Sequence, residues 1–201
     1  MAHQSLSPQI QGFKPKARNI RTYNFNARNF DRNYINELNR EDWEKAATAF
    51  VALMTDELIE KAVRMQPKEI HPYAVQNIID KLKKRRKYFV AEMMEYYRFI
   101  SKTVTVYGSN KKELFDVQRH ENGSVTVTVF KIAKNNEPDK KIYERRFLSN
   151  ETKEIRLYGL EGNDRFSLHG TDARQIRIRV IGGPGNDEYN IETLAAAGKT
   201  I

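Results

Sequence analysis

The spacing of apolar residues along the chain changes once, near residue 102. Between residues 39 and 102, apolar side chains recur at steps of three and four, as in Val75, Ile78, Ile79 and Leu82, which is the period of an amphipathic helix. From residue 103 onwards apolar and polar positions alternate, as in residues 125–129, which is the period of a half-buried strand. Helices followed by strands predict an α+β fold with about seven or eight strands.

The helical part is predicted to form a small bundle within residues 34–102. Asn39 and Thr55 each precede a run with acidic residues in its first turn, so each is expected to cap a helix. Pro67 is expected to end the second helix. Pro72 is expected to start the longest helix, which runs to about residue 102.

Residues 103–150 are predicted to form an antiparallel β-meander. The dipeptide at 122–123, Asn-Gly, is a strong hairpin signal because both residues accept positive φ. Strands are expected at residues 103–107, 113–120, 124–133 and 141–148. An extended leader at 1–33, a strand repeat at 151–192 and a tail at 193–201 complete the expected organisation.

The repeat occupies residues 154–168 and 177–191, which align without gaps at an offset of 23. Each copy reads as an apolar strand, a glycine-rich turn that ends in Asn-Asp, and a second apolar strand. Six of the fifteen aligned positions are identical, so the two copies are interpreted as stacked β units, like the coils of a β-roll. The identical pairs are Ile155/Ile178, Arg156/Arg179, Gly159/Gly182, Gly162/Gly185, Asn163/Asn186 and Asp164/Asp187.

The turn of the second copy, residues 182–190, fits the nonapeptide G-G-x-G-x-D-x-U-x, in which U is a large apolar residue. The first copy, residues 159–167, departs at its second glycine, where Leu160 stands. This motif resembles the calcium-binding β-roll of the RTX family. The resemblance implies that calcium is bound between turns and that the U side chain enters the core. The implied ligands are the carboxylates of Asp164 and Asp187 and the carbonyls of Gly159, Glu161, Gly182 and Pro184.

Two features separate the repeat from RTX arrays. Those arrays stack many turns about 18 residues apart, whereas this chain has two recognisable turns separated by 23 residues. The alternative to calcium binding is that each aspartate closes its turn by accepting hydrogen bonds from local backbone amides.

The order of segments also resembles the middle region of large surface proteins of Gram-negative bacteria. The likeness covers most of residues 20–192 and includes DRNYINELNREDW, EYYRFISKTVTVYGSNKKELFDV and IRIRVIGGPGNDEY. In that family a calcineurin-like metallophosphoesterase domain precedes the region and an outer-membrane β-barrel follows it. The resemblance implies a non-catalytic accessory or linker domain in the periplasm or at the cell surface. Its partners would be the other domains of a longer parent chain.

The composition of the chain predicts a basic surface. The chain has 35 Lys and Arg against 26 Asp and Glu, a formal net charge of +9, and part of the excess lies in the run at 81–87. This run is interpreted either as a binder of nucleic acid or an anionic surface or as a solvated helix face. The absence of cysteine excludes disulfides and thiol chemistry.

No catalytic motif is found. The four histidines, His3, His71, His120 and His169, are isolated in the sequence, and the metal-ligand clusters of a calcineurin-like phosphoesterase are absent. No nucleophile elbow, P-loop or dinucleotide fingerprint occurs. The sequence therefore predicts an accessory role. The remaining alternative is a part of a hydrolase whose active site lies outside this segment.

Overall fold

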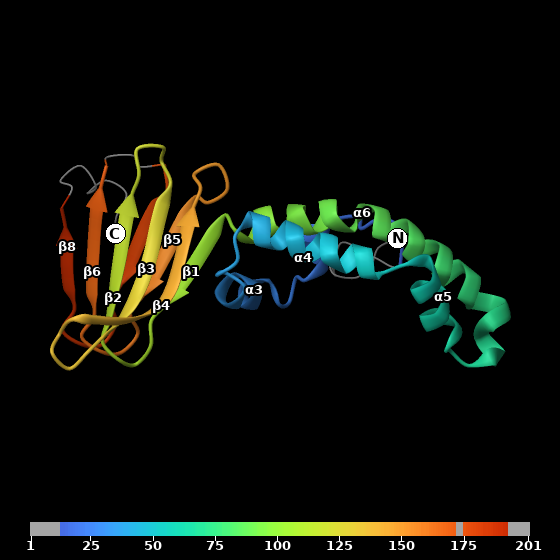
Figure 1. Cartoon of the computed structure of the whole chain (residues 1–201), viewed down its shortest axis with the longest axis horizontal. Helices are drawn as coiled ribbons and strands as arrows, with labels where there is room; N and C mark the ends of the chain where they lie inside the picture. The colour runs from blue at the N-terminus through green and yellow to red at the C-terminus, as the bar shows by residue number, and fades with distance from the viewer. Residues whose placement is uncertain (1–12, 172–174, 193–201) are drawn as a thin grey trace, which may run out of the picture. The chain divides into compact units, whose positions relative to one another are not determined.

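The computed structural model describes residues 13–171 and 175–192. The chain divides into two compact units, which are described separately. Met1–Arg28 and Arg40–Phe99 belong to the helical unit, and Asn29–Asn39 and Ile100–Ile201 belong to the β unit. Helices and sheets are both present (Figure 1), so the α+β fold class is confirmed.

Long amphipathic helices dominate the helical unit. Its helices are α2 (Ile20–Tyr23), α4 (Arg40–Leu53), α5 (Asp56–Arg64) and α6 (Gln76–Ile100), whose last residue lies in the β unit. A 3₁₀ turn (Lys68–Ile70) and a π-helical turn (His71–Val75) precede α6, so Pro72 lies in the π turn rather than at the start of the α-helix. The leader was expected to be extended, but it contains two helices, α2 and α3 (Arg28–Tyr34), whereas residues 13–19 are not helical.

The start of α5 follows the sequence prediction. The Thr55 hydroxyl accepts a hydrogen bond from the backbone N–H of Leu58 at 3.1 Å, which satisfies one of the free donors at the helix start. Ile59 then faces a buried cluster that Ile79 of α6 completes. Packing between apolar faces, rather than helix propensity, therefore holds α5 and α6 together.

The described residues of the β unit form two sheets. Sheet A has the order β1-β5-β7 and is parallel throughout. Sheet B has the order β4-β3-β2-β6-β8; its strands β2, β6 and β8 are parallel, and β3 pairs antiparallel with β2 and β4. The strands are β1 (Thr103–Tyr107), β2 (Glu113–Arg119), β3 (Val125–Ile132), β4 (Pro138–Phe147), β5 (Glu154–Tyr158), β6 (Arg165–Gly170), β7 (Arg177–Ile181) and β8 (Glu188–Ile191).

Strands that follow one another across a glycine turn lie in different sheets, so each strand–turn–strand segment is one coil of a β-roll. Coil 1 is residues 103–119, coil 2 is 154–170 and coil 3 is 177–191. Coils 2 and 3 pair in register at the offset of 23 that the repeat predicts, with Ile155 opposite Ile178 and Phe166 opposite Tyr189. Figure 1 shows β2, β6 and β8 side by side as successive members of sheet B.

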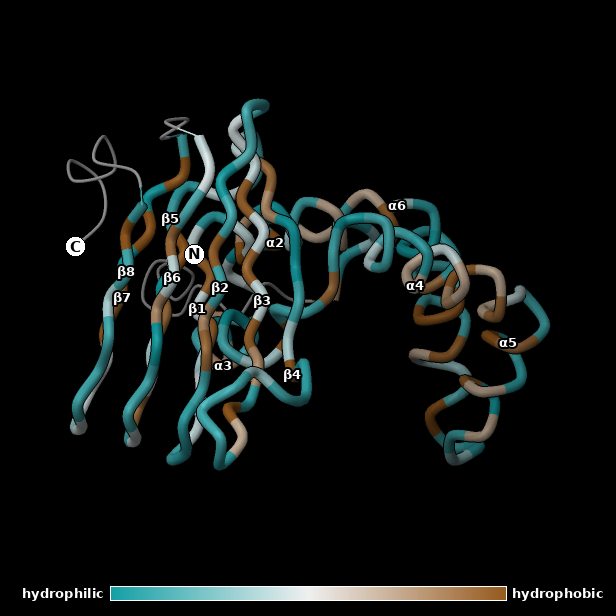
Figure 2. The backbone as a smooth tube through the Cα atoms, turned by 60° about the vertical axis from the view of Figure 1, so that its left-hand side comes forward, coloured by the Kyte–Doolittle hydropathy of each residue, from teal (hydrophilic) through white to brown (hydrophobic). Residues whose placement is uncertain are grey.

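The core of the β unit is shared by both sheets. Alternate residues of β1, β5 and β7 meet alternate residues of β2, β3 and β6 in one buried cluster. Figure 2 shows hydrophilic and hydrophobic stretches following one another along the strands. The cluster comprises Val104, Val106, Phe115, Val117, Val125, Val127, Val129, Phe147, Ile155, Leu157, Phe166, Leu168, Ile176 and Ile178.

The antiparallel meander is shorter than predicted. The structure limits it to β2, β3 and β4. The Asn122-Gly123 turn, where Gly123 has a φ of 77°, joins β2 to β3, and residues 133–137 join β3 to β4. Strand β1 does not pair with β2 but lies parallel to β5 in the other sheet. The reason is that the link at 108–112 is a coil turn that carries the chain from one sheet to the other, rather than a hairpin loop.

The segment 29–39 covers the end of the roll formed by β1 and β4. The Asn36 side chain donates to the Thr105 carbonyl of β1. The Asn36 carbonyl accepts from Arg145 at 2.5 Å and from the Tyr143 hydroxyl at 3.2 Å, both on β4. Asn36 thus binds one backbone carbonyl of β1, the edge strand of sheet A, and two side chains of β4, the edge strand of sheet B.

Candidate functional site

The site predicted from the repeat is a column of turns at one end of the coils. Coil 1 pairs with coil 2 at a constant offset of 51, with Tyr107 opposite Tyr158 and Phe115 opposite Phe166. The offsets of 51 and 23 place three acidic residues at equivalent positions, namely Glu113, Asp164 and Asp187. The acidic position therefore recurs in every coil that the structure describes.

These acidic residues connect one coil to the next through the backbone. The N–H of Glu113 donates to Oδ1 of Asp164 at 2.8 Å, and the N–H of Asp164 donates to Oδ1 of Asp187 at 3.0 Å. Asn163 adds a link of the opposite direction, because its side-chain oxygen accepts from the N–H of Asn186 in the next coil at 3.0 Å. Each carboxylate thus satisfies an amide of the neighbouring coil, and a hydrogen bond to an ionised acceptor is stronger than a neutral one.

Glycine is required at the start of the turn because the carboxylate packs against its backbone. A Cβ at Gly159 would lie 2.2 Å from Oδ2 of Asp164 and 2.6 Å from the carbonyl oxygen of Gly182. Both distances are far below van der Waals contact. The absence of a side chain at Gly159 therefore lets the acid fold inside its own turn.

Asp164 has a buried carboxylate oxygen that lacks a partner among the described residues. Its side chain is fully buried, and its Oδ2 makes no hydrogen bond within the part of the chain that the structure describes. Burial raises the pKa of Asp164 to about 6, and the nearby charges of Glu113 and Asp187 act in the same direction, while the hydrogen bond from Glu113 opposes them. A buried carboxylate oxygen without a partner is costly unless a proton or a cation neutralises it.

The implied calcium ligands are only partly available for an ion. Asp164 and Asp187 lie on adjacent coils, but one oxygen of each accepts a backbone amide. The Pro184 carbonyl accepts from the N–H of Gly162 at 3.2 Å, and the Gly182 carbonyl lies close to Gly159. The exposed Glu161 has no contact that ties it to the column among the described residues.

The aspartates accept hydrogen bonds from backbone amides, as in the turn-closure alternative, but these amides belong to the neighbouring coil and not to the aspartate's own turn. Among residues 13–171 and 175–192, no group of three or more His, Cys, Asp or Glu side chains is arranged to hold a metal. Calcium prefers about six to eight oxygen ligands, so the unpartnered Oδ2 of Asp164 supplies only one part of such a site. Calcium binding stays a prediction.

Leu160, which replaces the second glycine of the motif in the first copy, has a backbone conformation that is unfavourable for an L-residue. Leu160 has a φ of 77°, whereas the equivalent Gly183 has a φ of 105°. A positive φ brings the Cβ of an L-residue too close to its own backbone. Coil 2 therefore adopts the turn geometry of coil 3 without the residue that favours it.

The apolar U position forms a second column beneath the acids. The rings of Phe115 and Phe166 stack with centroids 4.7 Å apart, and those of Phe166 and Tyr189 stack at 5.4 Å. Phe115 and Phe166 are buried, whereas Tyr189 is 55% exposed. The predicted entry of the U side chain into the core thus holds for coil 2, and Tyr189 extends the column at the edge.

No family is identified for this chain. In comparisons with protein-family models, curated proteins and solved structures, no significant match is found. Inferences about function therefore rest on the geometry of the two units and on the sequence.

Coil 1 is the part of the site that the sequence did not reveal. Its turn keeps the first glycine, Gly108, and the acid, Glu113, but Lys111 and Lys112 replace the Gly-Asn pair of the other coils. A search at an offset of 51 would have found it, because Gly108 and Phe115 align with Gly159 and Phe166.

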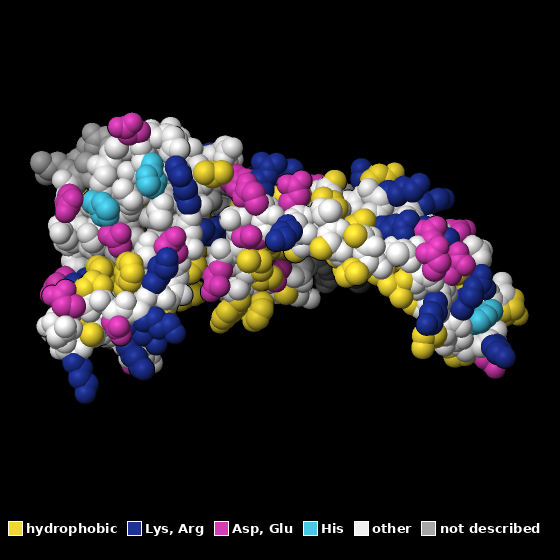
Figure 3. All heavy atoms as spheres, viewed as in Figure 1, with side chains coloured by type: hydrophobic (Ala, Val, Ile, Leu, Met, Phe, Trp, Pro, Cys, Tyr) yellow, Lys and Arg dark blue, Asp and Glu magenta, His cyan; other side chains and the backbone are white. Residues whose placement is uncertain are grey.

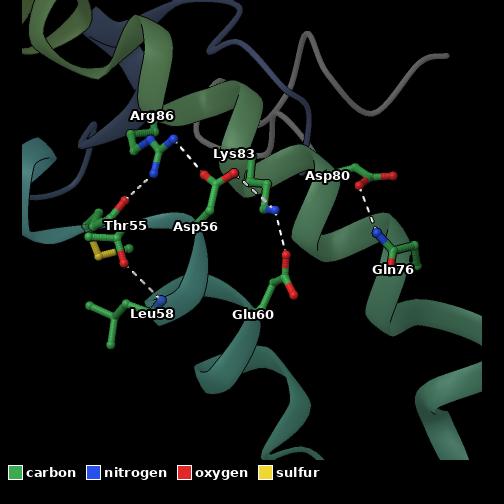
Figure 4. Close-up of polar contacts among 9 residues, drawn as sticks. Thr55, Asp56, Leu58, Glu60, Gln76, Asp80, Lys83 and Arg86 are labelled. Carbon is green, nitrogen blue, oxygen red and sulfur yellow. Dashed lines mark hydrogen bonds and ion pairs between the residues drawn. The ribbon is translucent and has the colours of Figure 1, made fainter.

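The basic run of α6 divides into two sets. Lys83 forms ion pairs with Glu60 at 2.6 Å and Asp56 at 3.2 Å, and Arg86 pairs with Asp56 at 2.7 Å, as Figure 4 shows. Lys84 and Lys87 are exposed. Basic and acidic side chains are interspersed on the face of the helical unit that Figure 3 displays. Two residues of the run, Lys83 and Arg86, therefore hold α6 against α5 through ion pairs. Binding of nucleic acid or an anionic surface by the run stays a prediction.

The histidines that the structure describes do not form a catalytic group with one another. His71 contacts the Gln66 carbonyl at 2.9 Å, His120 contacts the Thr126 hydroxyl at 2.8 Å, and His169 contacts Asp116 at 2.9 Å. None of the described helices is long and apolar enough to cross a membrane.

Proposed function

We propose that this chain is a non-catalytic accessory domain whose β unit is a stacking scaffold for a further coil of the same Gly-Asp type. The observation that carries the proposal is the difference between the two ends of the coil stack. One end is covered by segment 29–39, whereas coil 3 presents its edge strands. Stacked-repeat proteins need a terminal cap wherever the stack stops.

Coil 3 has the surface of an internal coil. All four residues of β8 are exposed, and Tyr189 and Ile191 are 55% and 46% exposed. The equivalent residues of coil 2, Phe166 and Leu168, are buried at 1% and 2%. A fourth coil in the same register would cover Tyr189 and Ile191 and continue both the ring column and the parallel pairing.

The hydrogen-bond pattern specifies what the added coil must contain. The amides of Glu113 and Asp164 each donate to the acid of the following coil. One more step of this pattern places an aspartate of the added coil beside the amide of Asp187. A glycine at the start of the added turn would provide the space that Gly159 and Gly182 provide in coils 2 and 3.

The setting of the proposal comes from the family resemblance. We place the domain in an extracytoplasmic parent protein, between a metallophosphoesterase domain and an outer-membrane barrel, where it connects the two.

Extension of the chain by one coil tests the scaffold. A second copy of residues 170–192 inserted after Glu192 keeps the offset of 23 and is expected to raise the midpoint of urea unfolding of the β unit and to slow amide exchange in β7 and β8. The matched control carries the same insertion with alanine at the positions equivalent to Gly182 and Asp187. Equal urea midpoints and equal amide-exchange rates in the extended protein and its alanine control would refute the stacking role.

Calcium support of the stack is a separate part of the proposal. The unpartnered Oδ2 of Asp164 is the observation that favours it. Millimolar calcium is expected to raise the melting temperature of the β unit at pH 8, because a ligand that binds only the folded state stabilises it. The increase should be absent in Asp187→Ala and retained in Asp139→Ala, which alters an exposed carboxylate. An unchanged melting temperature of the parent protein would exclude calcium support.

A further inference from the structure

A polar cleft of about 360 Å³ opens on the β unit beside the outer face of sheet A. Segment 29–39 contributes Asn29, Arg32 and Asn33, and sheet A contributes Tyr107, Arg156 and Tyr158. Binding sites for small molecules start at about 300 Å³, so the cleft can hold a ligand of one ring with a substituent.

Strand register explains why these side chains meet. Val104, Val106, Ile155 and Leu157 enter the core, so the alternate residues of β1 and β5 point outward. The parallel pairing then sets Thr105 beside Arg156 and Tyr107 beside Tyr158. The hydrogen bond from Asn36 to the Thr105 carbonyl holds segment 29–39 against β1, the strand that lines the cleft.

Arg156 is held in one orientation by a neighbouring acid. Its Nε donates to Oε1 of Glu154 at 2.8 Å, and Nε of Arg179 lies 3.3 Å from the same oxygen. Burial acts to raise the pKa of Glu154, but the Arg156 hydrogen bond and the arginine charges outweigh it and lower the pKa. Glu154 therefore stays ionised and fixes one edge of the guanidinium. The two-nitrogen edge suits a bidentate contact with an oxyanion.

The surroundings of the cleft attract anions. The outward positions of β5 and β7 hold Arg156, Arg177 and Arg179 against the single Glu154. Arg32 adds a further cation to the lining. Arginine side chains only donate hydrogen bonds, and the asparagine amides and threonine hydroxyls of the lining can donate as well. Such a lining favours a group with several acceptor oxygens.

Two tyrosines provide a surface for a ring. The rings of Tyr107 and Tyr158 lie with their centroids 5.3 Å apart, and Tyr107 is 41% exposed. Aromatic side chains at a wet surface offer an apolar face together with a polar hydroxyl. Because Arg156 lines the same cleft as the two tyrosines, a ligand ring that packs against the tyrosines can place an anionic substituent near Arg156.

We propose that this cleft binds a phosphate or sulfate monoester of a sugar-sized ring compound. Arg156 is the anchor of the oxyanion, Asn33 donates to the ester group, and Tyr107 and Tyr158 contact the ring. This inference does not depend on the scaffold role, because the lining of the cleft includes no residue of coil 3.

Calorimetric titration of the full chain with four probes tests the proposal. The probes are glucose 6-phosphate, glucose 6-sulfate, glucose and inorganic phosphate. At least one ester is expected to bind ten times more tightly than glucose and more tightly than inorganic phosphate, and the stronger ester identifies the oxyanion. Failure of both esters to bind more tightly than glucose would overturn the proposal.

Three variants locate the binding. Arg156→Gln is expected to weaken ester binding at least tenfold, and Arg177→Gln, a matched change on β7 outside the cleft, is expected to leave it within twofold. Because Arg156→Gln also removes the ion pair with Glu154, Asn33→Ala serves as a second test that keeps that pair, and it should weaken binding severalfold. Equal effects of Arg156→Gln and Arg177→Gln, or no effect of Asn33→Ala, would show diffuse attraction to the sheet and refute the site.

Discussion

Replacement of Asp164 by asparagine tests the account of the acidic column. The parent side chain is fully buried, with Oδ1 bonded to the Glu113 amide and Oδ2 without a hydrogen-bond partner among the described residues. Asparagine keeps an oxygen for the Glu113 amide and replaces Oδ2 by a neutral NH₂ group. The variant therefore removes a buried charge and keeps the contact between coils.

The expected difference in unfolding free energy between Asp164→Asn and the parent protein follows from the pKa of Asp164. Its folded pKa of about 6 lies above the ordinary aspartate pKa of 3.8, so the folded state binds the proton more tightly than the unfolded state. The stability contributed by that proton is complete below pH 3.8 and is lost as the pH rises through 6. A difference of roughly two pKa units corresponds to about 3 kcal/mol. Asp164→Asn should exceed the parent protein in stability by up to that amount at pH 8, and the gap should close near pH 4.

The assay is urea unfolding at pH 4, 6 and 8 in the presence of a chelator. Amide hydrogen exchange in β5 and β6 at each urea concentration follows the β unit, and the fluorescence of Trp43, the sole tryptophan, follows the helical unit as an internal reference. Asp187→Asn is the matched control at the partly exposed end of the column. A parent protein that is more stable than Asp164→Asn at pH 8 would refute the reasoning, because the buried carboxylate would then be stabilising in its charged form.

Three further substitutions test separate contacts by the same unfolding assay. Leu160→Gly should stabilise the β unit by about 1 kcal/mol, because relief of the positive φ exceeds the added chain entropy; a loss of stability would show that the Leu160 side chain matters more than its backbone. Gly159→Ala should destabilise the β unit by about 3 kcal/mol through the overlap with Asp164, and a change below 1 kcal/mol would contradict that close packing. Thr55→Ala should cost the helical unit about 1 kcal/mol through the lost cap of α5, visible in Trp43 fluorescence, whereas an unchanged midpoint would show that water replaces the cap.

The sequence predicted those elements whose information is local. The helices follow from apolar spacing and from Thr55, and the pairing of coils 2 and 3 follows from the identities at an offset of 23. Coil 1 was missed because Lys111 and Lys112 remove the Gly-Asn signature, and because β3 and β4 separate it from coil 2. Its membership depends on pairing at a distance of 51 residues, which a scan for near-identical copies does not detect.

The position of segment 29–39 also depends on contacts between residues that are distant in sequence. Its place in the β unit depends on Asn36, whose partners Thr105, Tyr143 and Arg145 are distant in sequence. No periodicity marks such a contact, because one side chain and one carbonyl make it. The cleft beside sheet A was not predicted for the same reason, since its lining combines this segment with β1 and β5.

The hairpin of β3 and β4 occupies the link between coil 1 and coil 2, yet both pairs of strands keep a constant register across it. The connection between successive coils thus accommodates a long excursion as well as a short one. Proteins of this architecture can acquire new surfaces by insertion at that point without redesign of the strands. The same connection is accordingly the natural place to graft a foreign loop or a labelled tag.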